Sequence, residues 1–262
     1  MDLGLRDKTC LVTASTGGLG FAIIESLARE GAHVVVNGRE ERSVSAAIDR
    51  VKTSVPGATL SAAVGNTATP EGCDTVITAC PAADVVVVNL GIYEAADIFE
   101  ATDEQWQRLI ETNVMSGVRL SRHYLKDMLA RNAGRMIFMA SESGINPAPE
   151  MPHYSATKTM QISLARNLAE TTKGTRVTVN SVLPGPSRTE GVAQLIAGLY
   201  PGMETEKAEH QFILDNRPTS LIQRLTEPRE VGDIVAFLAS DRTAIINGAA
   251  LRIEGGLIRT VM

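Results

Sequence analysis

Short β-branched runs alternate with longer helical patterns along most of the chain, and this alternation limits the possible folds more than any other feature. The expected strands span residues 10–13, 33–36, 59–64, 85–88, 135–139, 177–182 and 250–253. Helical periodicity covers residues 21–29, 41–52, 103–131 and 154–171 between them. Repeated β-α-β units predict an α/β protein, a doubly wound Rossmann fold with a mainly parallel seven-stranded sheet.

Helix boundaries carry signals of their own. Thr102 and Gln105 have the spacing of a capping box before the longest helix, and Gly134 follows its expected end. Pro228 suits the first turn of a helix near residues 229–239. No linker rich in Pro, Gly or Ser and no internal repeat interrupts the pattern. We therefore expect one dinucleotide-binding and catalytic domain over residues 1–262.

The less regular stretch from Pro184 to about Thr226 is long for a connection in such a fold. It contains several large apolar side chains and the turn residues Pro201 and Gly202. Two interpretations stay open. Residues 186–225 form a substrate lid, or they form a surface helical hairpin that buries its apolar residues against the sheet or another subunit.

Charge and composition exclude several classes of partner. The chain has 25 basic and 30 acidic residues and no basic tract, so neither nucleic acid nor an anionic membrane surface is expected to bind. Apolar runs such as residues 85–88 are far too short to span a bilayer. The start of the chain lacks an apolar signal core, and Cys10, Cys73 and Cys80 lack disulfide or metal spacing. We expect a cytoplasmic protein without a metal site.

A turn with three glycines, residues 13–20, follows the first expected strand and leads into a helix. Such a turn allows backbone N–H groups and the helix N-terminus to meet a dinucleotide pyrophosphate. Ser15 and Thr16 are positioned to add hydroxyl donors. The alternative is that the glycines only permit close packing of strand and helix.

The second expected strand ends in Asn37-Gly38-Arg39, with no carboxylate to bind an adenosine ribose. Arg39 is suited to neutralise a 2′-phosphate and to stack on adenine. NADP(H) is therefore the preferred cofactor, and NAD(H) is the alternative if Arg39 is only a solvated surface residue.

Tyr154 and Lys158 lie one helical turn apart. The i,i+4 spacing places a phenol and an ammonium on one helix face. A neighbouring positive charge favours phenolate, so we expect the lysine to lower the tyrosine pKa from about 10 toward neutrality and to enable general acid–base catalysis. Taken alone, the pair also fits a packed tyrosine beside a solvated lysine.

Together these segments resemble the short-chain dehydrogenase/reductase family of the classical type. The resemblance extends from Leu5 to about Gly256. It is carried by residues 13–20, Asn89-Leu90-Gly91, Asn113, Ser141, Tyr154 with Lys158, and Pro184-Gly185 followed by Thr189. The resemblance implies an NAD(P)(H)-dependent enzyme that acts on a small-molecule carbonyl or alcohol, and a homotetramer as the usual assembly. A non-catalytic NADP(H)-binding or redox-sensing module is the competing function.

The resemblance also implies roles for individual residues. Ser141, thirteen positions before Tyr154, would hydrogen-bond the substrate oxygen, and nearby Ser143 is a poorer candidate. Tyr154 would transfer the proton, Lys158 would bind the nicotinamide ribose, and Asn113 would position a water-linked proton relay. Cofactor contacts are implied for Ala14, Ser15, Thr16, Gly18, Leu19, Gly20, Arg39, Asn66, Asn89, Gly91, Tyr154, Lys158, Pro184, Gly185 and Thr189.

Two departures from the family pattern affect cofactor affinity rather than the type of reaction. Ala14 stands where the family has its first glycine, and residues 88–91 read Val-Asn-Leu-Gly instead of Asn-Asn-Ala-Gly. The extra methyl group of Ala14 is expected to tighten the approach of the phosphate.

Overall fold

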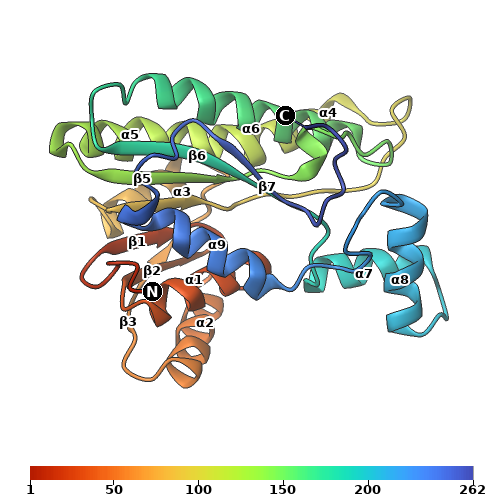
Figure 1. Cartoon of the computed structure of the whole chain (residues 1–262), viewed down its shortest axis with the longest axis horizontal. Coiled ribbons are helices and arrows are strands. Elements are labelled where there is room, and N and C mark those ends of the chain that lie inside the picture. Colours follow the sequence, from red (N-terminus) through yellow and green to blue (C-terminus); the bar gives the residue numbers. More distant parts are fainter. Residues whose placement is uncertain (262) are drawn as a thin grey trace.

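The computed structural model describes residues 1–261, and one sheet organises them (Figure 1). Within this range seven strands, all parallel, lie in the order β3-β2-β1-β4-β5-β6-β7. Their bounds are β1 (Thr9–Val12), β2 (His33–Gly38), β3 (Thr59–Val64), β4 (Val85–Val88), β5 (Gly134–Met139), β6 (Val177–Pro184) and β7 (Ala250–Ile253). The doubly wound fold is confirmed. The expected domain ends at Met262, which lies outside the described residues.

Helices cover both faces of the sheet (Figure 1). One face carries α1 (Gly18–Arg29), α2 (Glu41–Ser54) and α9 (Pro228–Ala239), and the other carries α3 (Pro70–Ala79), α5 (Ser116–Arg131) and α6 (Pro152–Glu170). The short helix α4 (Asp103–Leu109) packs against α6. Among the helices of residues 1–261, none has the length and apolar character needed to cross a membrane.

The central strand β4 shows why the sequence specifies this arrangement. Its four valines are all buried, as expected for a parallel strand covered on both faces. Alternate side chains point to opposite sides of a strand. Val85 and Val87 accordingly pack in the core under α1 and α9, while Val86 and Val88 pack in the core under α5 and α6.

The helical region expected over residues 103–131 is interrupted. A π-helical turn, Ile110–Met115, separates α4 from α5. The capping box is confirmed: the Thr102 hydroxyl accepts from the Gln105 N–H at 3.3 Å, and Gln105 Oε1 accepts from the Thr102 N–H at 2.8 Å. The helix ends at Asn132, in the left-handed conformation with φ 53°, and Gly134 already belongs to β5.

Residues 186–225 form a helical hairpin made of α7 (Glu190–Leu199) and α8 (Thr205–Asn216). In Figure 1 the two helices stand beside the sheet rather than on either of its faces. Their apolar side chains form a small cluster of their own, made of Ile196, Ala208, Phe212, Ile213 and Leu225. The segment is therefore a helical hairpin in its secondary structure, but its apolar side chains are buried against one another and not against the sheet.

Candidate active site

A cavity of about 410 Å³ opens at the carboxyl edge of the sheet. Strand order reverses between β1 and β4, which is the point where open α/β sheets bind ligands. Twelve of the expected site residues line the cavity: Ala14, Gly18, Leu19, Gly20, Asn89, Gly91, Ser141, Tyr154, Lys158, Pro184, Gly185 and Thr189. The others, Ser15, Thr16, Arg39, Asn66 and Asn113, lie outside its lining.

The start of α1 forms one wall of the cavity. Gly17, in the N-cap position, offers no side-chain cap, so the first N–H groups of the helix stay free for an anion. A Cβ atom added to Gly20 would lie 2.4 Å from the Ala14 carbonyl oxygen, so only glycine allows this close approach of the turn to the helix. These features fit a dinucleotide pyrophosphate.

Ala14 has φ 49°, in the left-handed region that favours glycine. Hydrogen bonds hold it there: its N–H donates to Asn37 Oδ1 at 2.9 Å, and its carbonyl oxygen accepts from Asn89 Nδ2 at 3.0 Å. Alanine in place of the family's glycine therefore has two effects here: it strains the backbone, and it adds a methyl group.

Ser15 does not supply the phosphate donor expected from the sequence. It is fully buried, and its hydroxyl accepts from the Asn37 N–H at 3.0 Å. Its own N–H donates to the Asn37 carbonyl at 2.8 Å. Asn37 also donates to the carbonyl oxygens of Ala63 and Gly65, so it joins the ends of three strands. Sequence reasoning missed this role, although a polar residue at the end of an apolar strand was a usable signal.

At the adenosine end, the expected contacts lie on exposed loops. Arg39 follows β2 and forms no salt bridge with another described residue, so its guanidinium is free to meet a phosphate. Asn66 follows β3, and its Oδ1 accepts from the Ala68 N–H at 3.2 Å. Thr16 is half-buried, with its methyl group close to Gly38. These residues are compatible with a cofactor that extends beyond the cavity.

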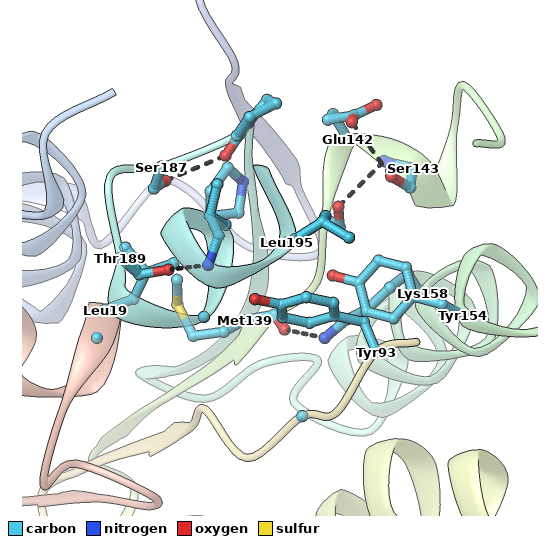
Figure 2. A pocket seen from close by; sticks show the side chains of 18 of the residues that line it. Leu19, Tyr93, Met139, Glu142, Ser143, Tyr154, Lys158, Ser187, Thr189 and Leu195 are labelled. Carbon is cyan, nitrogen blue, oxygen red and sulfur yellow. Dashed lines mark hydrogen bonds between the residues drawn. The ribbon is translucent and has the colours of Figure 1, made fainter. Parts of the chain in front are cut away.

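At the other end, Ser141 and Tyr154 meet. The Ser141 hydroxyl lies near enough to the Tyr154 phenol to lower its pKa, whereas the Ser143 hydroxyl donates to Glu142 Oε1 at 3.1 Å. The geometry thus favours Ser141 over Ser143. Figure 2 shows Tyr154, Tyr93 and Lys158 close together on one side of the cavity, and the two tyrosine rings are 5.9 Å apart.

Lys158 does not lower the tyrosine pKa as expected. Its Nζ lies 5.5 Å from the Tyr154 ring centroid and donates to the Met139 carbonyl at 2.9 Å and to Gln161 Oε1 at 2.8 Å. Burial dominates both groups because it disfavours their charged forms. It raises the pKa of Tyr154 to about 12, against the lowering effect of Ser141, and it lowers the pKa of Lys158 to about 7.

Asn113 occupies the π-helical turn. Its side chain exchanges hydrogen bonds with the Ile92 backbone, at 2.8 and 2.9 Å, and donates to the Thr157 hydroxyl. The Asn113 carbonyl accepts from Gln161 Nε2 at 2.6 Å. The buried Gln161 amide therefore joins Lys158 to this carbonyl, where the resemblance implied a water. Gln161 was missed, although its position three residues after Lys158 places it on the same helix face.

The segment after β6 completes the cavity. Thr189 caps α7 by accepting from the Val192 N–H at 3.3 Å, and its hydroxyl also contacts the Tyr93 phenol. Burial raises the pKa of Tyr93, against the lowering effect of Thr189. Across the cavity, a Cβ atom added to Gly91 would lie 3.2 Å from Lys158 Nζ, so the glycine leaves room for the ammonium.

Comparison with known proteins agrees with this geometry. A family model described as enoyl-(acyl carrier protein) reductase matches residues 13–258. The uncharacterized oxidoreductase YvaG of Bacillus subtilis (strain 168) is 51% identical over the full length of both chains. L-sorbose reductase from Gluconobacter frateurii, solved with NADPH and L-sorbose, is 31% identical, with a TM-score of 0.92 and full coverage of both chains.

A third protein is similar over most of its length. The 3-oxoacyl (acyl-carrier-protein) reductase from Agrobacterium tumefaciens C58, solved with NADP bound, is 27% identical, with a TM-score of 0.86; the match covers 97% of this chain and 96% of that one. Fold and site together define an oxidoreductase enzyme built on a dinucleotide-binding sheet. The chain belongs to the classical short-chain dehydrogenase/reductase family.

Proposed function

We propose that the protein is an NADP(H)-dependent oxidoreductase that interconverts a ketone or aldehyde with an alcohol, with Tyr154 as proton donor and acceptor. One observation carries this proposal. The hydroxyl-bearing residues Ser141 and Tyr154 line the same cavity as the uncapped start of α1. The cavity therefore contains hydroxyl groups that suit a carbonyl oxygen and a helix N-terminus that suits a dinucleotide pyrophosphate.

The cofactor is proposed from both the residues and the relatives. Two solved neighbours hold NADPH or NADP, and Arg39 offers an unpaired guanidinium after β2. The start of α1 would hold the pyrophosphate, Arg39 the 2′-phosphate and Asn66 the adenine. Lys158 and the residues Asn89, Gly91, Pro184, Gly185 and Thr189 would surround the two riboses and the nicotinamide.

Bound NADPH supplies the hydride for the carbonyl carbon. The carbonyl oxygen gains negative charge in this reaction, and Ser141 stabilises it by donating a hydrogen bond. Tyr154 then transfers its proton to the same oxygen, so that the product is a neutral alcohol. Because the pKa of Tyr154 is about 12 before the cofactor binds, the phenol is protonated at neutral pH and can donate its proton to the developing alkoxide. Reduction is the direction that NADPH favours.

Other features of the proposal concern the α7–α8 hairpin, the assembly and the substrate. We assign the α7–α8 hairpin to the substrate cover because Val192, Leu195 and Phe212 line the cavity. A homotetramer in the cytoplasm remains the expectation from the family resemblance. L-sorbose in the Gluconobacter frateurii complex supports a small-molecule substrate.

The test is a screen of NADPH and NADH oxidation over keto-esters, diketones, sugars, steroids and quinones. Turnover with NADPH that Tyr154→Phe abolishes supports the proposal. Tight NADPH binding by calorimetry without turnover of any carbonyl points instead to the non-catalytic sensor. Absence of nicotinamide binding overturns both functions.

A further inference from the structure

A buried ion-pair cluster lies beside the proposed catalytic serine. Glu142 directly follows Ser141, and its Oε1 accepts from Arg217 Nε at 2.9 Å. Arg217 Nη1 donates to Glu150 Oε1 at 3.1 Å and to the carbonyl oxygen of Asn216, at the end of α8. We call Glu142, Arg217 and Glu150 the carboxylate–arginine cluster. It connects the end of α8 with the segment that follows β5, residues 141–150.

The cluster belongs to the cavity wall. Glu142 is 2% exposed and Arg217 is 6% exposed, and both line the cavity. Figure 2 shows Glu142 and Ser143 on the Tyr154 side, across from Ser187 and Thr189. The neighbouring lining is largely apolar, with Met151, Leu195 and Phe212. Charged groups in such surroundings are costly unless they are fully hydrogen-bonded.

Hydrogen bonding within the cluster is incomplete. Glu142 Oε2 is buried and has no hydrogen-bond partner among residues 1–261. Arg217 uses Nε and Nη1, while Nη2 donates to none of the described residues. Glu142 and Arg217, which both line the cavity, thus keep one acceptor and one donor without a partner among the described residues. A hydroxyl group both donates and accepts, and it is therefore the ligand group that matches this pair.

The charge of the cluster selects among ligand classes. Burial raises the pKa of Glu142, against the lowering effect of Arg217. With Glu142 ionised the cluster carries one net negative charge, and with Glu142 protonated it carries none. Neither state offers the surplus positive charge that a carboxylate substrate needs. An apolar substrate would leave the spare donor and acceptor unpaired, which disfavours its binding.

We propose that the carboxylate–arginine cluster recognises a hydroxyl group of a neutral, hydroxylated ketone, so that sugar-like ketones are preferred over apolar ketones and keto acids. The proposal rests on the proposed carbonyl reduction and names its substrate class. In this proposal the buried second oxygen of Glu142 turns to the cavity surface when the substrate binds, and the substrate hydroxyl supplies the donor that this oxygen lacks.

The wild-type test compares three six-carbon substrates: a ketohexose, 2-hexanone and a keto-hexonic acid, each with NADPH. We expect kcat/KM for the ketohexose to exceed that for the other two by about tenfold or more, as for sites that hydrogen-bond a substrate hydroxyl. Equal or higher kcat/KM for 2-hexanone or the keto acid overturns this inference while the proposed function stands. Absence of turnover with every carbonyl overturns the proposed function itself.

A matched pair of variants separates recognition from stability. Arg217→Met keeps an aliphatic side chain but removes the guanidinium group. We expect it to lower the ratio of kcat/KM for ketohexose to that for 2-hexanone by about 10- to 100-fold, through KM for the ketohexose. Arg188→Met is the control, because Arg188 also pairs with two carboxylates of this region, Glu209 and Glu227, but does not line the cavity. It should leave the ratio unchanged.

Two outcomes overturn the proposal. Arg217→Met lowers turnover of both substrates equally, or Arg188→Met changes the ratio as much as Arg217→Met does. In either case the cluster only anchors α8. If Arg217→Met does not fold, Arg217→Lys keeps the charge and loses the planar fork, and the same ratio is measured.

Discussion

The two ends of the proposed cofactor site are held in different ways. At the catalytic end, Lys158 and Gln161 are buried and take hydrogen-bond partners from β5 and from the π-helical turn. At the adenosine end, Arg39 and Asn66 are exposed on separate loops. The first end is a connected network whose members depend on one another, whereas the second is a set of independent side chains.

This contrast separates two kinds of substitution. A change in the buried network leaves polar groups without partners, so it affects chemistry and packing together. A change at an exposed residue affects only the ligand group that this residue meets. The predictions below test that difference, beginning with the largest expected effect.

Tyr154→Phe tests the catalytic end directly. The variant keeps the ring and its contact with Tyr93 but removes the acidic hydroxyl. We expect kcat to fall by about 10³-fold, within the range for loss of a general acid, while Kd for NADPH changes far less, because the ring stays in place. Steady-state kinetics and calorimetry measure the two quantities. Retention of wild-type kcat would place the proton donor elsewhere.

Arg39→Ala tests the independence of the adenosine end. Loss of a charge-assisted contact to the 2′-phosphate should lower kcat/KM for NADPH by about 10- to 100-fold, whereas kcat/KM for NADH, which can lose only adenine stacking, should change much less. The melting temperature without cofactor should not move, because Arg39 is exposed and forms no salt bridge with another described residue. Arg42→Ala, a second exposed arginine nearby, is the control. An equal loss with NADH contradicts the assignment.

The pKa of Lys158 predicts the pH dependence of cofactor binding. Burial lowers that pKa to about 7, so the free protein loses the charge as pH rises through 7. The nicotinamide ribose, whose hydroxyl groups would accept from Lys158, favours the ammonium, so binding takes up a proton above pH 7, and affinity should fall by at most about tenfold per pH unit there. Calorimetry in buffers of different ionisation enthalpy measures the uptake. Lys158→Met should abolish it.

Substitutions of Gln161, which accepts a hydrogen bond from Lys158, should shift the pH at which NADPH affinity begins to fall. Gln161→Glu places a carboxylate beside Lys158 and should raise the pH at which affinity begins to fall, by about one unit. Gln161→Leu removes the acceptor and should shift it downward. If both variants titrate like the wild type, the proton is not taken up by Lys158.

Ala14→Gly should have the smallest effect. Glycine adopts φ 49° without the penalty that alanine meets, and it removes one methyl group beside the phosphate site. Loss of the methyl group should let NADPH bind a few-fold more tightly, with kcat unchanged, while the relieved backbone strain should raise the free energy of unfolding by about 1 kcal/mol. Weaker binding would show that the alanine methyl group makes a favourable contact.

The sequence predicted those parts of the site that depend on local spacing. Tyr154 and Lys158 share a helix, and Ser141 follows a strand whose end was correctly placed. It did not predict contacts between distant segments, such as Ser15 with Asn37, since those depend on strand register. The tyrosine pKa was predicted from one neighbouring charge, whereas burial, a property of the whole fold, dominates.

The π-helical turn at Ile110–Met115 sets the rotation of α5 relative to α4. Such a turn corresponds to one residue inserted into an α-helix, which advances everything downstream by about 100° of rotation. Deleting a single residue here would restore continuous α-helical geometry between α4 and α5. The apolar residues Leu120, Tyr124 and Met128, which pack in the core under α5, would then rotate by about 100° relative to the buried Leu109 of α4, so both helices could not keep their apolar faces buried.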